Sequence, residues 1–95
     1  MSMGFEWDQG KAEANLKKHG IGFDEAATVF ADPFSVTISD PDHSLKEARF
    51  IDIGTSNKGR VLVVSYTERQ GRIRIISCRK ATAYERRTYE ECNRR

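Results

Sequence analysis

The chain of 95 residues carries a formal net charge of +2, and this length predicts one domain with a small but sufficient core. No stretch is long or apolar enough to cross a bilayer, and no signal peptide precedes the expected fold, so we expect a cytosolic protein. The two cysteines, Cys78 and Cys92, lack the spacing and partners of a zinc site. They predict reduced thiols and neither a metal nor another cofactor.

The charges are divided unevenly along the chain. Residues 1–57 hold five Lys or Arg and ten Asp or Glu, whereas residues 58–95 hold eleven and four. Ten of the sixteen cations are Arg, which suits bidentate contacts with phosphate or carboxylate. The basic half therefore predicts nucleic acid or an acidic partner, and the alternative is a soluble surface with uneven charges.

The first element that the sequence predicts is a short strand at residues 5–7, with Trp7 in the core. Asp8 has the features of a helix N-cap, and Gly20 those of the glycine that follows a helix end. Apolar residues recur between them at helical spacing, with lysines in the last turn, where the helix dipole favours cations. A helix is therefore expected between Asp8 and Gly20.

A second, shorter helix is predicted at residues 23–30, capped by Asp24 and ended before Asp32-Pro33. Residues 34–39 alternate apolar and polar side chains, which indicates a strand. The run Asp40-Pro41-Asp42 ends this strand.

The C-terminal half predicts a meander of antiparallel strands, because "SNKG" and "RQG" supply turn residues between three apolar runs. These runs lie at about 47–55, 60–69 and 72–80. The motif Thr82-x-x-Glu85 is a capping box, so the last helix should start at Ala83. The expected fold is α+β, an antiparallel sheet of three to four strands with two N-terminal helices and one C-terminal helix.

The turns also suggest a register for the sheet. One face should form the core under the helices, with side chains from Ile51, Ile53, Leu62, Val64, Tyr66, Ile73 and Ile75. Its two ends carry polar residues, namely Arg60, Ser77 and Arg79 at one end and Arg49 and Glu68 at the other. The second face mixes apolar and basic residues, as expected of a surface that meets a partner: Val61, Val63, Ser65, Thr67, Arg69, Arg72, Arg74, Ile76, Cys78 and Lys80.

On this register Arg79 ends one strand nearly opposite Arg60 at the start of its neighbour. The N-terminus of the last helix should lie close by, with free backbone N–H groups. Two guanidinium groups and a helix N-terminus together predict an anion site. The alternative is that each arginine pairs with an Asp or Glu of the acidic half.

Three segments carry a family resemblance over about residues 5 to 91. They read "FEWDQGKAEANLKKHGIGFDEAATVFADP", "DHSLKEARFIDIGTSNKGRVLVVSYTER" and "RIRIISCRKATAYERRTYEE". Together they resemble the BrnT family of toxins. The family's strand-end run usually reads I-S-A-R, and Cys78 here takes the place of the alanine. Because Cys78 and Arg79 should face opposite ways, we expect this departure to have little effect on the chemistry.

The resemblance implies the toxin of a type II toxin–antitoxin pair, with a RelE-like fold. It implies an endoribonuclease that cuts RNA without a metal and arrests growth. The implied partner is a BrnA antitoxin, which binds operator DNA itself and joins the toxin in a two-plus-two assembly. The main alternative is a binding module without catalysis, which captures the antitoxin and acts as a co-repressor through it. A direct DNA binder is disfavoured because no helix is rich in base-reading residues.

RelE-like proteins use an Arg at a strand start, an Arg at the end of the following strand and often a Tyr on the last helix. Arg60, Arg79 and Tyr89 occupy corresponding places, and Tyr84 could substitute for Tyr89. Metal-free cleavage of RNA needs cations that stabilise the growing phosphoryl charge, together with a base and an acid. The two arginines are candidates for the first role. Tyr89 could donate a proton or stack on a base, and the alternative is that it packs the last helix on the sheet.

Other side chains are candidates for the base and the acid. His19 is a candidate for either role because imidazole commonly acts as a general acid or base, and the alternative is a His that interacts with the end of its own helix. His43 could reach a site from its loop or pin that loop by bonding a neighbouring aspartate. Glu47 and Glu68 are possible bases, although a Glu near Arg is more often an ion-pair partner. Candidates for contacts with the RNA backbone, or else for solvated surface cations, are Lys18, Lys58, Arg74 and Lys80.

Overall fold

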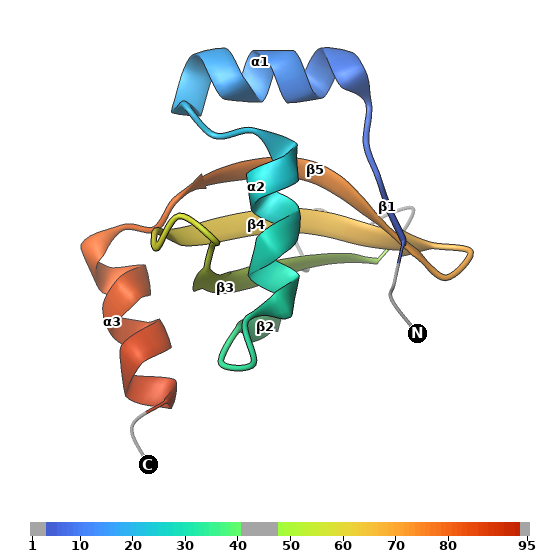
Figure 1. Cartoon of the computed structure of the whole chain (residues 1–95). Helices are drawn as coiled ribbons and strands as arrows, with labels where there is room; N and C mark the ends of the chain where they lie inside the picture. Colours follow the sequence, from blue (N-terminus) through green and yellow to red (C-terminus); the bar gives the residue numbers. More distant parts are fainter. Residues whose placement is uncertain (1–3, 41–47, 94–95) are drawn as a thin grey trace.

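The structure is a computed structural model that describes residues 4–40 and 48–93. Within these residues the strands form one five-stranded sheet in the order β1-β5-β4-β3-β2. Figure 1 shows α1 and α2 against one face of the sheet and α3 beyond the end at which β5 stops. The elements are β1 (Gly4–Glu6), α1 (Gln9–His19), α2 (Phe23–Thr28), the 3₁₀ turn η1 (Val29–Ala31), β2 (Val36–Ser39), β3 (Arg49–Thr55), β4 (Val61–Arg69), β5 (Arg72–Lys80) and α3 (Ala83–Cys92).

The α+β class and the helix order are confirmed, but the sheet is larger than predicted. In the described part of the chain it has five strands rather than three to four. The additional pairing is that of β1 with β5, in which Gly4 lies opposite Arg72 and Glu6 opposite Arg74. Because these two strands are parallel, the sheet is mixed rather than purely antiparallel.

The ends of α1 follow the sequence signals. The carboxylate of Asp8 accepts a hydrogen bond from the backbone N–H of Lys11 at 2.9 Å, and Gly20 follows the helix with φ of +71°. The prediction for α2 was less accurate, since its N-cap is Gly22 and Asp24 lies inside the first turn. The helix also tightens to a 3₁₀ turn at Val29 instead of continuing to the predicted end.

The hairpin between β3 and β4 contains one residue more than predicted. The N–H of Ser56 donates to the carbonyl of Arg60 at 2.8 Å, and Thr55 pairs with Val61. Arg60 therefore belongs to the turn rather than to the strand. A shift of one residue moves every side chain of a strand to the other face, so the predicted faces of β3 were wrong.

The pairing of β5 with β4 contains a second shift, between Ser65 and Tyr66 of β4. This irregularity leaves β5 with one residue more than its partner, as in a β-bulge. As a result Cys78 pairs with Val64, and Arg79 pairs with Val63 on the opposite face. The predicted positions of Cys78 on the second face and of Arg79 beside the core were therefore wrong.

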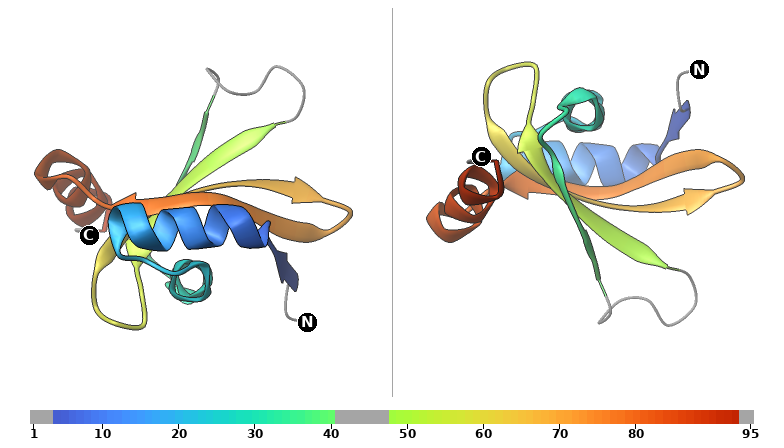
Figure 2. Two further views of the ribbon diagram at one scale, coloured as in Figure 1. Left: turned by 90° about the horizontal axis from the view of Figure 1, so that it is seen from above. Right: turned by 90° about the horizontal axis from the view of Figure 1, so that it is seen from below.

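The two faces of the sheet are covered very differently (Figure 2). The α1–α2 face holds the main core, in which sheet residues pack against helix and loop residues: Leu62, Val64, Tyr66, Ile73, Ile75 and Cys78 with Ile21, Phe23, Ala26 and Val29. Trp7 is half-buried and packs edge-on against Phe23, with ring centroids 6.0 Å apart. The α3 face carries a smaller cluster, in which α3 contributes Tyr89: Ile53, Val63 and Ala81 with Ile51, Val61 and Tyr89.

Gly54 lets η1 and the loop after it lie directly on β3. A Cβ atom at this position would lie 2.9 Å from Cγ1 of Val29 and 3.1 Å from the carboxylate of Asp32. The close approach places Asp32 beside the end of β3, where its carboxylate accepts a hydrogen bond from the N–H of Thr55 at 2.8 Å.

As for membrane insertion, none of the helices in the described residues has the length and apolarity needed to span a bilayer.

Candidate functional site

A cleft of about 450 Å³ lies where β4 begins and β5 ends. The residues that line it are Gly59, Arg60, Val61, Lys80 and Arg86. The described lining thus contains three cationic side chains and no carboxylate. A concave surface of one sign of charge attracts anions, and guanidinium groups match the geometry of phosphate.

The cations of this cleft come from three different elements. The turn before β4 contains Gly59, which has φ of +79°, and ends at Arg60. The carbonyl of Val61 accepts a hydrogen bond from the N–H of Ala81 at 3.0 Å, which holds the end of β5 beside the start of β4. The helix α3 starts two residues later with the predicted capping box and places Arg86 one turn after its N-cap.

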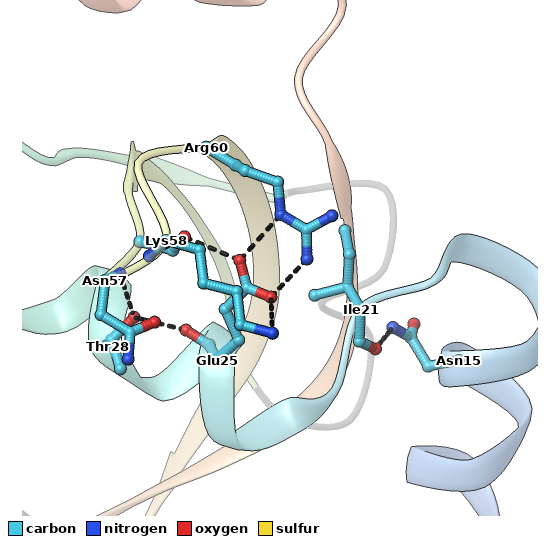
Figure 3. Close-up of polar contacts among 8 residues, drawn as sticks. Asn15, Ile21, Glu25, Thr28, Asn57, Lys58 and Arg60 are labelled. Carbon is cyan, nitrogen blue, oxygen red and sulfur yellow. Dashed lines mark hydrogen bonds and ion pairs between the residues drawn. The ribbon is translucent and has the colours of Figure 1, made fainter.

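Arg60 is held by Glu25 of α2. Its Nε donates to one carboxylate oxygen at 3.0 Å and its Nη2 donates to the other. The hydroxyl of Ser56 donates to the same carboxylate at 2.7 Å, and Nζ of Lys58 lies 3.9 Å from it. Figure 3 shows Arg60 and Lys58 directed at this carboxylate from the hairpin.

The protonation state of Glu25 follows from these contacts. The hydrogen bonds from Arg60 hold the pKa of the Glu25 carboxyl below its usual value, although burial opposes the shift. Glu25 is therefore an anion at neutral pH and a poor proton acceptor. The remaining terminal nitrogen of Arg60, Nη1, makes no hydrogen bond with a described residue, and Arg60 lines the cleft, so this donor is available to a ligand.

Arg79 makes a similar pair on the α3 face. Its Nη1 and Nη2 donate to the two carboxylate oxygens of Glu85 at 2.7 and 2.8 Å. Hydrogen bonds from Arg79 and from the N–H of Thr82 lower the pKa of Glu85 to about 2. Arg79 is not among the residues that line the cleft, so the predicted anion site made by Arg60 and Arg79 together does not form. The alternative of an ion pair with the acidic half is confirmed for Arg60, whereas the partner of Arg79, Glu85, lies in the basic half.

Tyr89 attaches α3 to the rest of the molecule. Its hydroxyl donates to the carboxylate of Asp32 at 2.6 Å and lies 3.0 Å from the hydroxyl of Thr55. Burial and the neighbouring Asp32 raise the pKa of Tyr89. These contacts match the alternative of a packing role, while Tyr84 on the same helix is 75% exposed.

His19 lies at the same end of the sheet as the cleft. Asn15, one helical turn earlier, accepts a hydrogen bond from the N–H of Cys78 at 3.0 Å. Figure 1 shows α1 and β5 running in the same direction. Along α1, His19 lies about 6 Å beyond Asn15, and along β5, Lys80 lies about 7 Å beyond Cys78. His19 is half-buried and is not among the lining residues, so its catalytic role stays a prediction.

The other candidate residues are spread over the molecule. Lys18 is exposed on α1, and Lys58 is 68% exposed beside the Arg60–Glu25 pair. Arg74 instead pairs with Glu6 of β1 at 3.0 Å. Glu68 is exposed near the far end of β4, about 26 Å along the strand from the cleft. His43 and Glu47 lie outside the described residues.

Two residues of the site were missed by the sequence analysis. Arg86 follows Thr82 by four residues, so the capping box already indicated that it lies one turn into α3. No comparable signal pointed to Glu25, because its partner Arg60 is 35 residues away. Within residues 4–40 and 48–93, no cluster of three His, Cys, Asp or Glu side chains could hold a metal ion.

Comparisons with known proteins agree with this architecture. The family model described as the ribonuclease toxin BrnT of type II toxin–antitoxin systems matches residues 7–85. Among solved structures, the chain is similar to the ribonuclease toxin BrnT of Brucella abortus, with a TM-score of 0.63 and 23% identity over 85% of this chain and 99% of that one. A search of curated proteins gave no significant match. Because the family model covers most of the sequence, this chain belongs to the BrnT family of ribonuclease toxins of type II toxin–antitoxin systems.

Proposed function

We propose that this chain is a metal-independent endoribonuclease that arrests growth in the cytoplasm and is neutralised by a BrnA-type antitoxin. Family membership supplies the classes of ribonuclease and toxin. The observation that carries the proposal is the cleft, which Arg60, Lys80 and Arg86 line without a carboxylate. We assign the scissile phosphate of the RNA to this cleft, with chemistry of the RelE type.

The proposed reaction is an attack by the 2′-hydroxyl on the neighbouring phosphorus. The 2′ oxygen gives its proton to a base and bonds to phosphorus, while the 5′ oxygen leaves and takes up a proton. The products are a 2′,3′-cyclic phosphate and a 5′-hydroxyl. Negative charge grows on the phosphoryl oxygens, where fixed cations stabilise the transition state. DNA lacks the 2′-hydroxyl and is not a substrate.

The residues of the cleft divide this work by position. Arg60 and Arg86 are the guanidinium donors for the phosphoryl oxygens, and Lys80 contributes a third positive charge. His19 is our candidate for proton transfer, because imidazole is the side chain most often used as a general acid or base and α1 ends at this end of the sheet. Glu25 is unsuited to this role because the hydrogen bonds from Arg60 lower its pKa, which makes it a weak base and leaves it without a proton to donate.

The test is cleavage of a labelled RNA by the purified protein in the presence of EDTA. The double variant Lys80→Ala/Arg86→Ala should lower kcat/KM about 10²-fold, because two cationic contacts with the phosphate are removed. Arg87→Ala is the matched control, since Arg87 is exposed on the same helix and does not line the cleft. Activity that requires an added metal ion, or a fully active double variant, would contradict the proposal.

One observation favours a second candidate, a non-catalytic module that binds the antitoxin and acts as a co-repressor through it. Both predicted catalytic arginines are already neutralised, Arg60 by Glu25 and Arg79 by Glu85. A binding module would produce no new RNA ends at any protein concentration. It would still form the two-plus-two complex with the antitoxin, which native mass spectrometry can detect.

A further inference from the structure

A buried carboxylate lies beside the cleft, and the proposed reaction does not use it. Glu25 is only 4% exposed, although its helix lies at the surface of the sheet. Its two oxygens receive hydrogen bonds from Arg60 and from the hydroxyl of Ser56, and Lys58 lies close to it. A buried charge persists in a protein when it is paired and hydrogen-bonded, as this one is.

The geometry of the pair restricts Arg60 strongly. Two of its three guanidinium nitrogens are used by Glu25, which fixes both the position and the plane of the group. Nη1 has no hydrogen-bond partner among the described residues, and Arg60 lines the cleft. The backbone around the pair is also fixed, because the hydroxyl of Thr28 joins the carbonyl of Glu25 to the N–H of Asn57 at 2.6 and 2.9 Å.

We propose that Glu25 is a positioning residue, which holds the guanidinium of Arg60 in the one orientation that presents Nη1 to the scissile phosphate. This inference rests on the proposed function of the cleft. An arginine in a turn has many rotamers, and an oriented donor stabilises a transition state better than a mobile one. Glu25 acts through Arg60 and does not touch the RNA.

Chemical rescue tests the role of Glu25 directly. Arg60→Ala should lower kcat about 10²- to 10³-fold, as expected when one stabilising donor is removed. Because the Glu25 carboxylate remains, it should hold an added guanidinium ion in the vacated place, and guanidinium chloride should restore about 10-fold of the lost kcat. The double variant Arg60→Ala/Glu25→Gln should show no restoration, and potassium chloride at equal ionic strength controls for salt.

The single variant Glu25→Gln provides a second readout. Its kcat should fall about 10-fold or more while KM stays within about 2-fold, since Lys80 and Arg86 still bind the RNA. Glu25→Asp, which keeps the carboxylate, should recover part of the loss. If Glu25→Gln does not fold, Ser56→Ala replaces it, because this change removes one hydrogen bond to the carboxylate and leaves both charges. It should lower kcat about 2- to 5-fold.

The outcomes separate the inference from the proposed function. Equal rescue of Arg60→Ala and of the double variant, or wild-type kcat in Glu25→Gln, overturns the positioning role. The assignment of the phosphate to the cleft is then retained. Full activity of Arg60→Ala overturns the assignment of the phosphate to the cleft, and the positioning role with it. Arg72→Ala is the control for loss of an ion-paired arginine, since it pairs with Glu6 far from the cleft.

Discussion

Each face of the sheet carries an arginine that pairs with a glutamate at the same end of the molecule. The two ion pairs differ in the sequence separation of their partners and in the burial of the glutamate. On the α1–α2 face, Arg60 and Glu25 are 35 residues apart in the chain, and the glutamate side chain is 4% exposed. On the α3 face, Arg79 and Glu85 are six residues apart, and the glutamate is 23% exposed. The first pair joins distant elements, whereas the second joins a strand to the helix that follows it.

Because of this difference, the two Arg–Glu ion pairs have different roles in the molecule. The pair of Arg60 and Glu25 fixes the β3–β4 hairpin against α2 and leaves one guanidinium nitrogen of this cleft-lining arginine without a partner among the described residues. The pair of Arg79 and Glu85 uses both terminal nitrogens and reinforces the capping box of α3. We therefore expect changes at Arg60 to affect the reaction, and changes at Arg79 to affect the attachment of α3.

The largest effect should separate these two arginines in an RNA cleavage assay. Arg60→Ala should lower kcat about 10²- to 10³-fold, which corresponds to about 3 to 4 kcal/mol of transition-state stabilisation. Arg79→Ala should lower it less than about 10-fold, because Arg79 lies on the other face and outside the cleft lining. Single-turnover kinetics on one RNA measures both.

Circular dichroism should confirm that both variants are folded. The opposite ranking, with Arg79→Ala the more damaged enzyme, would place the phosphate on the α3 face and would support the catalytic role that the family resemblance implies for Arg79. A pair of equally inactive variants would show that α3 must be fixed for the reaction to occur.

The sequence was sufficient to predict the order and type of the helices and strands. It was insufficient to predict which strand side chains lie on which face of the sheet. Local chemistry predicted the start of α3 at Ala83 and the cap at Asp8, because each signal lies within one turn of the element that it marks. The faces of β3 and of the end of β5 depend on the length of one turn and on one bulge. Neither leaves a periodic signal, and each moves all later side chains to the other face.

The same dependence on how the elements pack explains why the candidate site was predicted only in part. Arg60 was predicted as the first residue of a strand and lies instead at the end of the turn before β4, whereas Lys80 was identified correctly as a cation at the end of the next strand. The partner of Arg60 was out of reach, because the contact with Glu25 exists only after the hairpin packs against α2. The parallel pairing of β1 was missed for a similar reason, since three residues are too few to show a pairing preference.

The second prediction compares the hydrophobic contacts of the two faces through adjacent valines of β4. Val64 is fully buried in the main core, and Val63 belongs to the smaller cluster under α3. Val64→Ala should lower the free energy of unfolding by about 2 to 3 kcal/mol, and Val63→Ala by about 1 to 2 kcal/mol. The second loss is smaller because fewer neighbours surround Val63 in the smaller cluster. Urea denaturation with a common m-value measures the difference. Equal losses would show that the α3 face is as well packed as the core.

The third prediction tests how α3 is attached. Tyr89→Phe removes the hydroxyl that bonds Asp32 and Thr55 and should lower the free energy of unfolding by about 1 to 2 kcal/mol. Tyr84→Phe is the matched control and should have no measurable effect, because Tyr84 is 75% exposed. Thermal unfolding reports both. A Tyr89→Phe protein that is stable but no longer cleaves RNA would instead make Tyr89 a catalytic residue.

The smallest effect concerns the pH dependence of the exposed pair. The pKa of Glu85 in the folded protein is about 2, below its ordinary value of 4.5, so the folded state binds the proton less tightly than the unfolded state. Its contribution to stability is therefore complete above the unfolded pKa and is lost as the pH falls toward the folded pKa. Because Arg79 is 43% exposed, solvent screening reduces this contribution to the order of 1 kcal/mol.

Comparison of the wild type with Glu85→Gln isolates this contribution from that of the other carboxylates. The difference in the free energy of unfolding should be largest near neutral pH and should shrink as the pH falls from about 5 toward about 2. Urea titrations at several pH values measure it, and Glu90→Gln serves as a control on the exposed side of α3. A difference that stays constant over this range would mean that the pair of Arg79 and Glu85 does not stabilise the fold. The start of α3 would then depend on its capping box alone.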